Sequence, residues 1–477
     1  MLIPSRSLWL LIATSLAWIS SHPEWAGVDV REARGLSGEA LKSNLQKSKV
    51  RRVVLTEVAF GDEERVPMFA EHRVGDAIPA ALTGKAVAVK RGAKHLEVDS
   101  DGDGKFDLRV TRAQVIEVGD ESERSPVLMY PKQGEWYACA GRAFRGKIGR
   151  AAVLFLDLDL DGKLSAGKDL VRIGTGAFGL HQKGRQLWTG SRVVTYEIVE
   201  KDGHLVLEWH EPASAKIKDS RIRKAFQLIN GHRNSAGLQA LLPDAKSTDA
   251  CKKHIAYLNR HFAVRHQTKV TAKELDGPHS EDPAKKGYTK EGAQAAQEGS
   301  IGQSGNPVHD YNPGLWSTAL HRQAMLSRLS AQAGIAYGGN FSITWIRDWF
   351  PMTPTLPVFV PAPGQQNVLT DVYHEIPEPE KHADYYKQPR GFPISVTYLD
   401  SWTDVEIRLF YAKTDRPVQG EFFSPTKPVH SARPANMRAL IFIADHPLKP
   451  KTWYRATLTG KHQGKPRTYH WGFRTRS

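Results

Sequence analysis

Cysteine is nearly absent from this chain of 477 residues, which contains only Cys139 and Cys251. Small secreted domains that rely on disulfides in place of a large core carry many more cysteines. The sequence therefore excludes a disulfide-built scaffold, and it also excludes a zinc knuckle made of cysteines. We predict that both thiols are free and buried, with a single disulfide as the alternative in an oxidising compartment.

Long hydrophobic runs are missing after the start of the chain. The first residues have the organisation of an export signal, in which Arg6 supplies the positive charge, "LWLLIATSLAWI" the apolar run and Ala26 a small residue. No later run approaches the roughly 20 apolar residues that a membrane-spanning helix needs. We therefore predict a signal peptide at residues 1–26 and a mature protein that is secreted, periplasmic or located at the cell surface.

Sequence signatures of several large enzyme classes are also missing. The chain contains no phosphate-binding loop, no dinucleotide-binding glycine fingerprint and no H-E-x-x-H zinc motif. The segment "GQSGN" around Ser304 lacks the second glycine of the nucleophile elbow G-x-S-x-G and follows no predicted strand. These absences argue against nucleotide-dependent enzymes, zinc peptidases of that class and hydrolases with a serine elbow.

Acidic residues are scarce in the second half of the chain. From Lys218 onward there are 35 Lys and Arg against 22 Asp and Glu, whereas residues 1–217 have 31 against 29. Positive charge on an exported protein attracts polyanions whatever the fold. We therefore expect a cell-wall polymer, a lipid or another envelope component as partner, with solubility alone as the alternative explanation. The export signal argues against nucleic acid.

Short strand-like segments dominate residues 27–216. They are rich in β-branched residues and separated by Gly or Asp turns: "RRVVLTEVAF", "KAVAVK", "AAVLFLDLDL" and "SRVVTYEIVE". This composition predicts a mostly-β region, which holds either one large domain or two small ones.

Helical spacing of apolar residues replaces the strand pattern at residues 217–350. "IRKAFQLINGHRNSAGLQALL" and "DAKSTDACKKHIAYLNRHF" predict two helices, the second starting at Asp244. The polar stretch "DGPHSEDPAKKGYTKEGAQAAQEGS" predicts a loop. "LHRQAMLSRLSAQAG" predicts a further helix that ends at Gly334, and "FSITWIRDW" predicts a short strand.

Strands return after a proline-rich linker at residues 351–357. Five evenly spaced segments predict a β-sandwich at residues 358–477: "ISVTYL", "VEIRLFY", "ALIFIA", "WYRATLTG" and "YHWGFRT". The last two resemble the closing strands of bacterial Ig-like domains. The predicted fold class is therefore multidomain, with an N-terminal mostly-β region, a central domain of helices and strands, and a C-terminal Ig-like β-sandwich.

Aromatic and basic residues alternate at the end of the chain. Between Lys449 and Ser477 there are eight Lys or Arg and no acid. Such alternation can form a surface that stacks on polyanions, but in a strand it also gives one core face and one solvated face. We predict the structural arrangement, because the aromatic residues fall at strand spacing: Trp453, Tyr454, Tyr469, Trp471 and Phe473.

Two loops carry alternating carboxylates followed by a glycine, "VDSDGDGKFD" and "LDLDLDGKLS". Such a loop can converge several oxygens on one hard cation such as Ca²⁺. Neither loop completes an EF-hand, since the twelfth position is Val110 or Lys168 in place of Glu. The alternative is a hairpin whose Asp-Gly turn needs the same residues. The candidate calcium ligands are Asp99, Asp101, Asp103 and Asp107 in the first loop, which has the larger set, and Asp157, Asp159 and Asp161 in the second.

Two motifs in the middle of the chain match one known family in order and spacing. "LINGHRNSAGLQAL" places Asn230, Arg233 and Gly237 at the spacing N-x-x-R-x-x-x-G-L. The stretch from His321 to Gly334 is similar to the bacterial pattern H-R-x-N-I-L-N-P-x-F-T-E-I-G. This part of the chain therefore resembles a CAP-superfamily (SCP-like) domain, the family of cysteine-rich secretory proteins, antigen-five allergens and plant pathogenesis-related proteins, in its bacterial secreted form.

The resemblance implies a three-layer α-β-α domain with a central cleft. In many members two histidines and two acidic residues line this cleft, and the histidines can hold a divalent metal such as zinc. Residue by residue, His321 matches the second histidine, His279 the first and Glu298 one acid, with Glu281 as the alternative acid. The resemblance also implies that His254 and Tyr257 pack in the core.

The chain departs from the family pattern in the turn "WSTAL" before His321, at Ser247 and, most importantly for the cleft, at Gln332. Gln332 stands where the resemblance places the second acid, eleven residues after His321. An amide forms hydrogen bonds but cannot act as a base or supply negative charge. Two imidazoles and one carboxylate would still bind a metal ion, with lower affinity.

The weakened acid set favours binding over catalysis. We expect an exported binding protein whose cleft takes a small apolar or peptide-like ligand or a divalent metal. One alternative is a metal-assisted hydrolase, with His279 and His321 as zinc ligands and Glu298 or Glu281 as the base that activates a water. The other is a non-catalytic structural or adhesion module.

Overall fold

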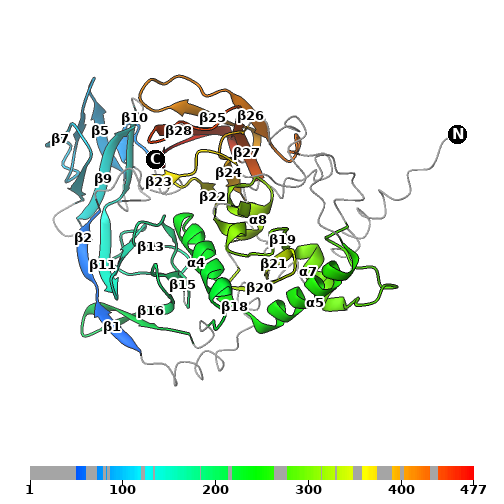
Figure 1. Ribbon diagram of the computed structural model, residues 1–477. Helices are drawn as coiled ribbons and strands as arrows, with labels where there is room; N and C mark the ends of the chain where they lie inside the picture. The colour runs from blue at the N-terminus through cyan, green and yellow to red at the C-terminus, as the bar shows by residue number, and fades with distance from the viewer. Residues whose placement is uncertain are drawn as a thin grey trace. The chain divides into compact units, whose positions relative to one another are not determined.

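The computed structural model describes sixteen stretches of the chain, all within the compact unit Val50–Ser477 (Figure 1). They are residues 50–60, 72–78, 82, 86–119, 124–132, 135–182, 184–212, 217–262, 277–312, 314–327, 330–347, 357–372, 389–397, 402–429, 439–462 and 464–477. The predicted signal peptide and nearly all of the predicted linker at 351–357 lie outside the described residues. None of the described helices is both long and apolar enough to cross a membrane.

The described residues of the N-terminal region are mostly in strands, as predicted, and these strands form four antiparallel sheets. The sheet orders are β1-β17-β16-β15, β14-β13-β12-β11-β2, β3-β10-β9-β8 and β4-β5-β6-β7. The strands are β1 (Arg51–Val54), β2 (Thr56–Ala59), β3 (His72–Arg73), β4 (Ala77–Ile78), β5 (Val87–Arg91), β6 (Leu96–Val98), β7 (Leu108–Val110), β8 (Gln114–Val118), β9 (Ser125–Lys132), β10 (Glu135–Ala140), β11 (Arg142–Ile148), β12 (Ala151–Leu156), β13 (Leu170–Ile173), β14 (Gly179–Leu180), β15 (Gln186–Trp188), β16 (Val193–Lys201) and β17 (His204–His210).

The five-stranded sheet of this region is buried on both faces. Along β12, Val153 and Phe155 belong to one hydrophobic core, whereas Leu154 and Leu156 belong to another. Successive side chains of a strand point to opposite faces. A strand buried on both faces therefore needs a continuous apolar run, which accounts for the sequence "AAVLFL".

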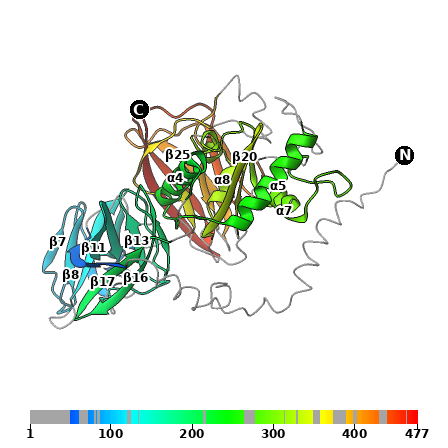
Figure 2. The same cartoon turned by 60° about the horizontal axis from the view of Figure 1, so that its bottom comes forward.

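The described strands of the central part form a four-stranded sheet, of order β18-β20-β21-β19, with helices on both faces (Figure 2). Ala333 and Ile335 of β20 pack in the core that includes Ala225 and Ile229 of α4. On the other face, Ala336 packs with residues of α5 and α7. The elements are α4 (Ser220–Ser235), β18 (Leu242–Pro243), α5 (Ala245–His261), α7 (Lys290–Glu298), β19 (Ser300–Gly302), η5 (His309–Tyr311), η6 (Gly314–Ser317), α8 (His321–Met325), β20 (Gln332–Gly338) and β21 (Phe341–Ile346).

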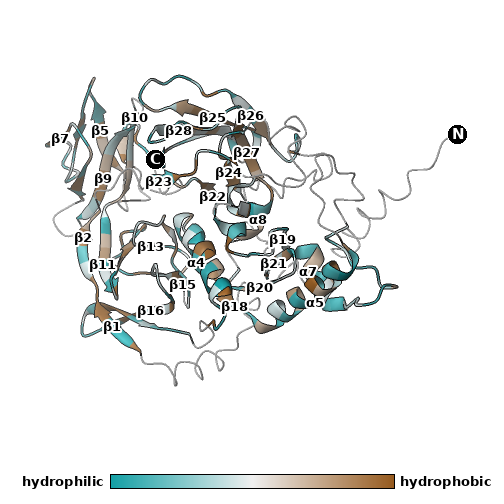
Figure 3. Cartoon of the chain, in the orientation of Figure 1, coloured by the Kyte–Doolittle hydropathy of each residue, from teal (hydrophilic) through white to brown (hydrophobic). Residues whose placement is uncertain are grey.

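Helices α4 and α5 were predictable from their caps and their apolar spacing. The side chain of Asp219 accepts hydrogen bonds from the first amides of α4, and that of Asp244 accepts one from Ser247 at the start of α5. Figure 3 shows hydrophilic and hydrophobic residues alternating along α4, as expected of a helix with one face in a core. His254 and Tyr257 of α5 are buried, which confirms the packing that the family resemblance implies.

Two local predictions in this part were wrong. Residues 290–298, predicted as loop, form helix α7, which is capped by the Thr289 hydroxyl accepting from the amide of Gly292. Its two buried alanines supply both helix propensity and a packing surface. The helix predicted from Leu320 to Gly334 ends at Met325, and Gln332 already begins β20.

A buried arginine accounts for the early end of α8. The guanidinium of Arg233 in α4 donates to the carbonyl oxygens of Met325, Ser327 and Ser330 at 2.6, 3.0 and 3.0 Å. A continued helix would need these carbonyl groups for its own hydrogen bonds. Among the described residues between Met325 and β20, namely 326–327 and 330–331, none is helical.

In the C-terminal part, the described strands form two four-stranded sheets that share one hydrophobic core. Their orders are β22-β24-β27-β26 and β23-β29-β28-β25. Val396 from the first sheet and Leu458 from the second belong to the same core. The Ig-like assignment stays a prediction. The strands are β22 (Val358–Val360), β23 (Gln365–Val368), β24 (Ile394–Thr397), β25 (Trp402–Tyr411), β26 (Gly420–Phe423), β27 (Ala439–Ala444), β28 (Trp453–His462) and β29 (Lys465–Thr475).

Several C-terminal aromatic residues lie in this core. Tyr454, Trp471 and Phe473 are almost fully buried, and Tyr469 packs against the core from its edge. The indole nitrogen of Trp471 donates to the carbonyl oxygen of Pro361 at 2.9 Å. The prediction of a core face rather than a polyanion-stacking surface is therefore confirmed for these residues.

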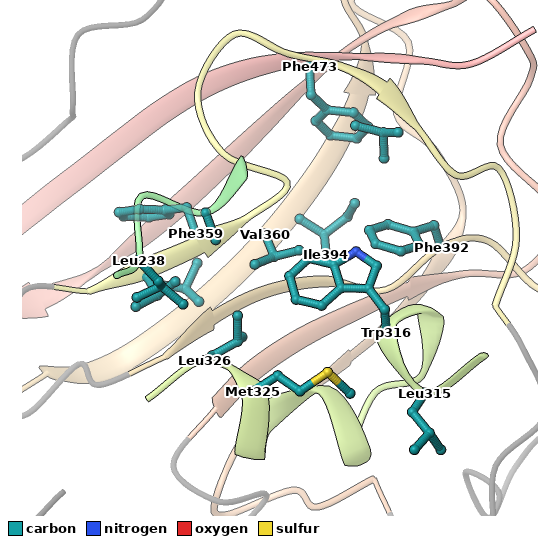
Figure 4. Close-up of a cluster of buried hydrophobic side chains, with 14 of the residues drawn as sticks. Leu238, Leu315, Trp316, Met325, Leu326, Phe359, Val360, Phe392, Ile394 and Phe473 are labelled. Atoms are coloured by element: carbon teal, nitrogen blue, oxygen red, sulfur yellow. The ribbon is translucent and has the colours of Figure 1, made fainter. Parts of the chain in front are cut away.

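The same core continues into the central part of the chain. Trp316 of η6 lies beside Phe392 and Ile394 of the C-terminal part, while Met325 and Leu326 lie close by (Figure 4).

The two cysteines, Cys139 in β10 and Cys251 in α5, are free and buried, as predicted.

Candidate functional site

His279 lies in the turn that precedes α7 and is half-buried. Its Nδ1 atom is 2.8 Å from the carbonyl oxygen of Ala296 in α7. A carbonyl oxygen only accepts, so Nδ1 carries the proton and a neutral ring has its lone pair on Nε2. This is the tautomer that a histidine needs in order to ligate a metal through Nε2.

His321 is the first residue of α8 and is also half-buried. The charge of His321 acts on Asp310 of η5 through space, in the direction that lowers the pKa of that carboxyl group. The next residue, Arg322, is buried and donates to the carbonyl oxygen of Pro393 at 2.6 Å. The start of α8, and with it the backbone of His321, is therefore held in place by the C-terminal part.

Asp310 is a buried acid that sequence reasoning missed. Its carboxylate accepts hydrogen bonds from the hydroxyl groups of Ser342 in β21 and, at 3.1 Å, of Ser304. Burial raises the pKa of Asp310, while these hydroxyl groups and the charges of His309 and His321 oppose the shift. A buried carboxyl group with a shifted pKa that also responds to two histidines is a candidate functional group. The signal in the sequence was the acid of "HDYNPGLWS", eleven residues before His321.

A glycine makes room for this carboxylate. A side-chain carbon on Gly302 of β19 would lie 2.3 Å from the nearest oxygen of Asp310. Gly302 pairs with Ser342 in the sheet. The carboxyl group of Asp310 therefore lies directly against the β19–β21 pair, with Ser342 on one strand and bare backbone on the other.

Glu298, predicted as a cleft acid, connects α7 to the sheet. Its two oxygens accept from the amide of Gln294 at 3.1 Å and from the indole of Trp345 at 2.9 Å. Trp345 belongs to the core between α5, α7 and the sheet. Ser342, which binds Asp310, is three positions from Trp345 on β21, so their side chains point to opposite faces of the sheet. Asp310 and Glu298 therefore approach the sheet from opposite faces.

Glu281, the alternative cleft acid, is buried and engaged in structural contacts. One oxygen is 2.9 Å from Nδ1 of His254, and the other accepts from the amide of Thr289 at 2.9 Å. The second ring nitrogen of His254 is 2.8 Å from the carbonyl oxygen of Pro278. Both nitrogens of His254 lie at hydrogen-bond distance from oxygen atoms, so Glu281 and His254 tie α5 to the segment that precedes α7.

Gln332 lies away from Asp310. It is the first residue of β20 and stands opposite Leu242 of β18, five residues before Tyr337. Tyr337 pairs with Ser342, the partner of Asp310. At about 3.3 Å per residue, Gln332 is on the order of 16 Å along the strand from Ser342.

Among the described residues, neither His279 nor His321 belongs to a group of three clustered metal-ligating side chains, so the zinc site stays a prediction.

The two Asp-rich loops do bring acidic groups together. In the first loop the ligand atoms of Asp99, Asp101 and Asp103 lie within 4.8 Å of one another. Asp107 is not a member of this group, because its oxygens accept from the amide and the hydroxyl of Ser100. These hydrogen bonds lower the pKa of Asp107 and close the loop.

In the second loop the group consists of Asp157, Asp159 and Asp169, again within 4.8 Å. Asp161 is not a member, and its side chain accepts from the amide of Lys163. Burial raises the pKa of Asp157 to about 7 and that of Asp169 to about 6. Asp169 was missed because it lies outside the D-x-D-x-D-G run. The available signal was an acid directly before the next strand.

Comparison with known families supports the assignment of the central part. The model of the CAP family, described as the cysteine-rich secretory protein family, matches residues 226–343. These residues lie inside the predicted range 217–350. No curated protein matches the chain.

Two solved bacterial structures are similar to part of the chain. One is an extracellular protein containing an SCP domain from Bacillus anthracis str. Ames, with 11% identity, 57% of this chain and 88% of that chain covered, and a TM-score of 0.20. The other is a cysteine-rich secretory protein from Staphylococcus aureus subsp. aureus Mu50, with 8% identity, 55% and 85% covered, and a TM-score of 0.18. At these TM-scores the likeness carries no argument about fold or activity.

Proposed function

Residues 226–343 of this chain form a CAP domain, and from this premise we propose that the protein is an exported binding protein whose ligand site is centred on His321 and Asp310. The observation that carries the proposal is the buried Asp310 carboxylate, which two serine hydroxyls and Gly302 hold against the sheet and whose pKa responds to the charges of His309 and His321. A small ligand with peptide-like donors fits this arrangement, because the carboxylate accepts and the serine hydroxyls can reorient. A divalent metal is the other ligand class under test.

The state of the acids favours binding over catalysis. A metal-assisted hydrolase needs a carboxylate that is available to take a proton from water. Both oxygens of Glu281 and both oxygens of Glu298 already accept hydrogen bonds that hold α5, α7 and the sheet together. Using either acid as a base would break contacts on which the fold depends.

The charge of the chain supports a place of action at the cell envelope. Most of the excess positive charge lies from Lys218 onward, in the CAP domain and the C-terminal part. Such charge attracts anionic wall polymers or lipid headgroups at long range. The domain would then meet its ligand close to the surface from which the ligand comes.

Binding titrations on the whole chain test the proposal. The probes are Zn²⁺ by calorimetry, a pool of unlabelled tripeptides by ligand-observed NMR, and an anionic naphthalene dye by fluorescence. We expect one probe class to bind in the micromolar to millimolar range, and His321→Ala to weaken that binding at least about tenfold. The matched control is His204→Ala, at an exposed histidine of β17.

The results separate the candidate functions. Binding that is lost with His321 but unchanged with His204 supports the proposal. Stoichiometric Zn²⁺ binding accompanied by turnover of ester or peptide substrates would favour the hydrolase. If His321→Ala binds every probe as strongly as His204→Ala does, or if the wild type binds no probe, the proposal is wrong.

A further inference from the structure

The second Asp-rich loop closes a β-hairpin in which two acids are adjacent. Asp157 follows the last residue of β12, and Asp169 precedes the first residue of β13. Leu156 and Leu170 pair across these strands, so the two acids lie side by side at the end of the hairpin. Asp159, in the loop between them, completes the group within 4.8 Å.

Asp157 has a buried oxygen that the protein does not satisfy. Its carboxylate is fully buried; Oδ2 accepts from the amide of Gly162 at 2.9 Å and lies 3.8 Å from Arg142. No partner within the described residues hydrogen-bonds to the buried Oδ1 atom. Leaving such an oxygen unpaired is costly, and natural proteins rarely do so without a bound water or ion.

Asp169 adds a second fully buried carboxylate to the same place. Its oxygens accept from the amides of Leu158 and Ser165, at 2.8 and 2.6 Å. Each carboxylate oxygen keeps a second lone pair after one such bond. The amides therefore orient Asp169 without using up its capacity to bind a cation.

The first Asp-rich loop lacks this feature. Asp99 is its buried acid, and both of its oxygens accept from backbone amides, those of Gly102 at 2.8 Å and Gly104 at 3.1 Å. The loop is thus a self-contained turn as far as its described residues show. Its similar sequence makes it an internal control for the second loop.

We propose that residues 157–169 form a binding site for one Ca²⁺ ion, with Asp157, Asp159 and Asp169 as its side-chain ligands. Three carboxylates with flexible loop geometry suit Ca²⁺, which takes six to eight oxygen ligands, better than Mg²⁺, which demands a small octahedral shell. The remaining positions are available to water, as in many extracellular calcium modules. This site lies outside the CAP domain and does not depend on the function proposed above.

Lys168 opposes cation binding at this site. Its ammonium group lies 3.2 Å from Oδ2 of Asp159, and its side chain is 64% exposed. Because it is so exposed, Lys168 can turn into solvent when a cation binds. Replacing it with an uncharged residue removes a competing positive charge, so Lys168→Gln strengthens Ca²⁺ binding several-fold without disturbing the buried ligands.

Calorimetric titration of the chelator-treated whole chain with CaCl₂ tests the site. We expect one ion per chain with a dissociation constant between about 1 μM and 1 mM, and a much weaker response to MgCl₂. Asp169→Asn should weaken binding at least about tenfold. Asp103→Asn, in the first loop, should leave it unchanged.

Two results would overturn the proposal. One is the absence of a Ca²⁺ response up to about 10 mM, roughly ten times the highest dissociation constant expected of such a module. The other is a loss of affinity that Asp103→Asn causes and Asp169→Asn does not. Lys168→Gln keeps the test decisive if Asp169→Asn fails to fold, because it changes only an exposed side chain. Unchanged or weaker binding by that variant counts against the site.

Discussion

Arg233 shows at the scale of single residues why the N-x-x-R motif of the central domain exists. Its guanidinium is fully buried and donates to four carbonyl oxygens, of which that of Gln239 is at 2.8 Å. Asn230 binds both the amide and the carbonyl of Leu241. The motif therefore fixes the irregular backbone that the helices and the sheet leave between them.

We predict that Arg233→Met lowers the free energy of unfolding by about 3–5 kcal/mol, because four buried carbonyl groups lose their donor. Urea unfolding followed by circular dichroism measures the change. Arg223→Met in the same helix, where the side chain is exposed, should cost less than about 1 kcal/mol. Comparable losses in the two variants would contradict this role of Arg233.

His232 gives a prediction about pH. Burial lowers the pKa of His232 to about 4, against the hydrogen bond to the carbonyl of Tyr311, and the ring stacks on Trp316. The unfolded chain has a pKa near 6.5 and therefore binds the proton first as pH falls. The protonation of His232 therefore has no effect on stability above pH 6.5, lowers the free energy of unfolding between pH 6.5 and about 4, and has no additional effect below that.

His232→Phe keeps a stacked ring but removes the titration. Between pH 6.5 and 4, we expect this variant to lose up to about 3 kcal/mol less stability than the wild type, since one pH unit is worth about 1.4 kcal/mol. Burial also lowers the pKa values of His181 and His470 to about 4. These two histidines therefore lower the free energy of unfolding in acid in the wild type and in His232→Phe alike. Identical pH profiles from denaturant unfolding would refute the assignment.

At the scale of elements, the strands and the two long helices were predictable because local patterns agree with their burial. Asp244 and the apolar spacing after it specify α5 before any tertiary contact is known. Helix α7 was missed because its segment is polar and only two alanines face the core. The end of α8 was missed because it depends on Arg233, about ninety residues away in sequence.

Less of the candidate site could be predicted, because its residues are brought together by contacts between distant parts of the sequence. His321 and His279 came from family spacing, which says nothing about their neighbours here. Asp310 meets Ser342 only because η5 packs on the sheet, and Asp169 meets Asp157 only because β12 pairs with β13. Such contacts between distant residues have no local signature.

Two glycines allow a matched test of the packing between α5 and the sheet. A side-chain carbon on Gly334 of β20 would lie 2.2 Å from the backbone of Ser247 in α5, whereas one on Gly231 of α4 would meet nothing within 4 Å. We predict that Gly334→Ala destabilises the protein by about 1–3 kcal/mol or more. Gly231→Ala, inside a helix, should stabilise it by about 0.5–1 kcal/mol. Thermal unfolding of both variants measures the effect, and equal shifts would contradict the close approach.

At the scale of the whole molecule, the CAP domain and the C-terminal strands are not independent in packing. Trp316, Met325 and Leu326 share a core with Phe392 and Ile394. Arg322, next to His321, donates to the carbonyl of Pro393 and lies 4.8 Å from the ring centre of Phe392. The C-terminal part therefore supports the segment that carries the candidate site.

We predict that the CAP domain alone, residues 217–350, folds poorly because this shared core becomes exposed to water. The longer fragment 217–477 should keep the cooperative unfolding of its central domain. Near-UV circular dichroism and dye binding distinguish the two outcomes. A well-folded 217–350 fragment with full stability would show that the shared core is dispensable.

Ligand binding at His321 and Asp310 can be followed by NMR of the whole chain with isotope-labelled histidine. The ring signals are followed while the probe with the highest affinity is added. We expect the signals of His321 and His309 to shift together and to saturate at one ligand per chain, while that of His204 does not move. Saturable binding that leaves the His321 signal unchanged would contradict this expectation.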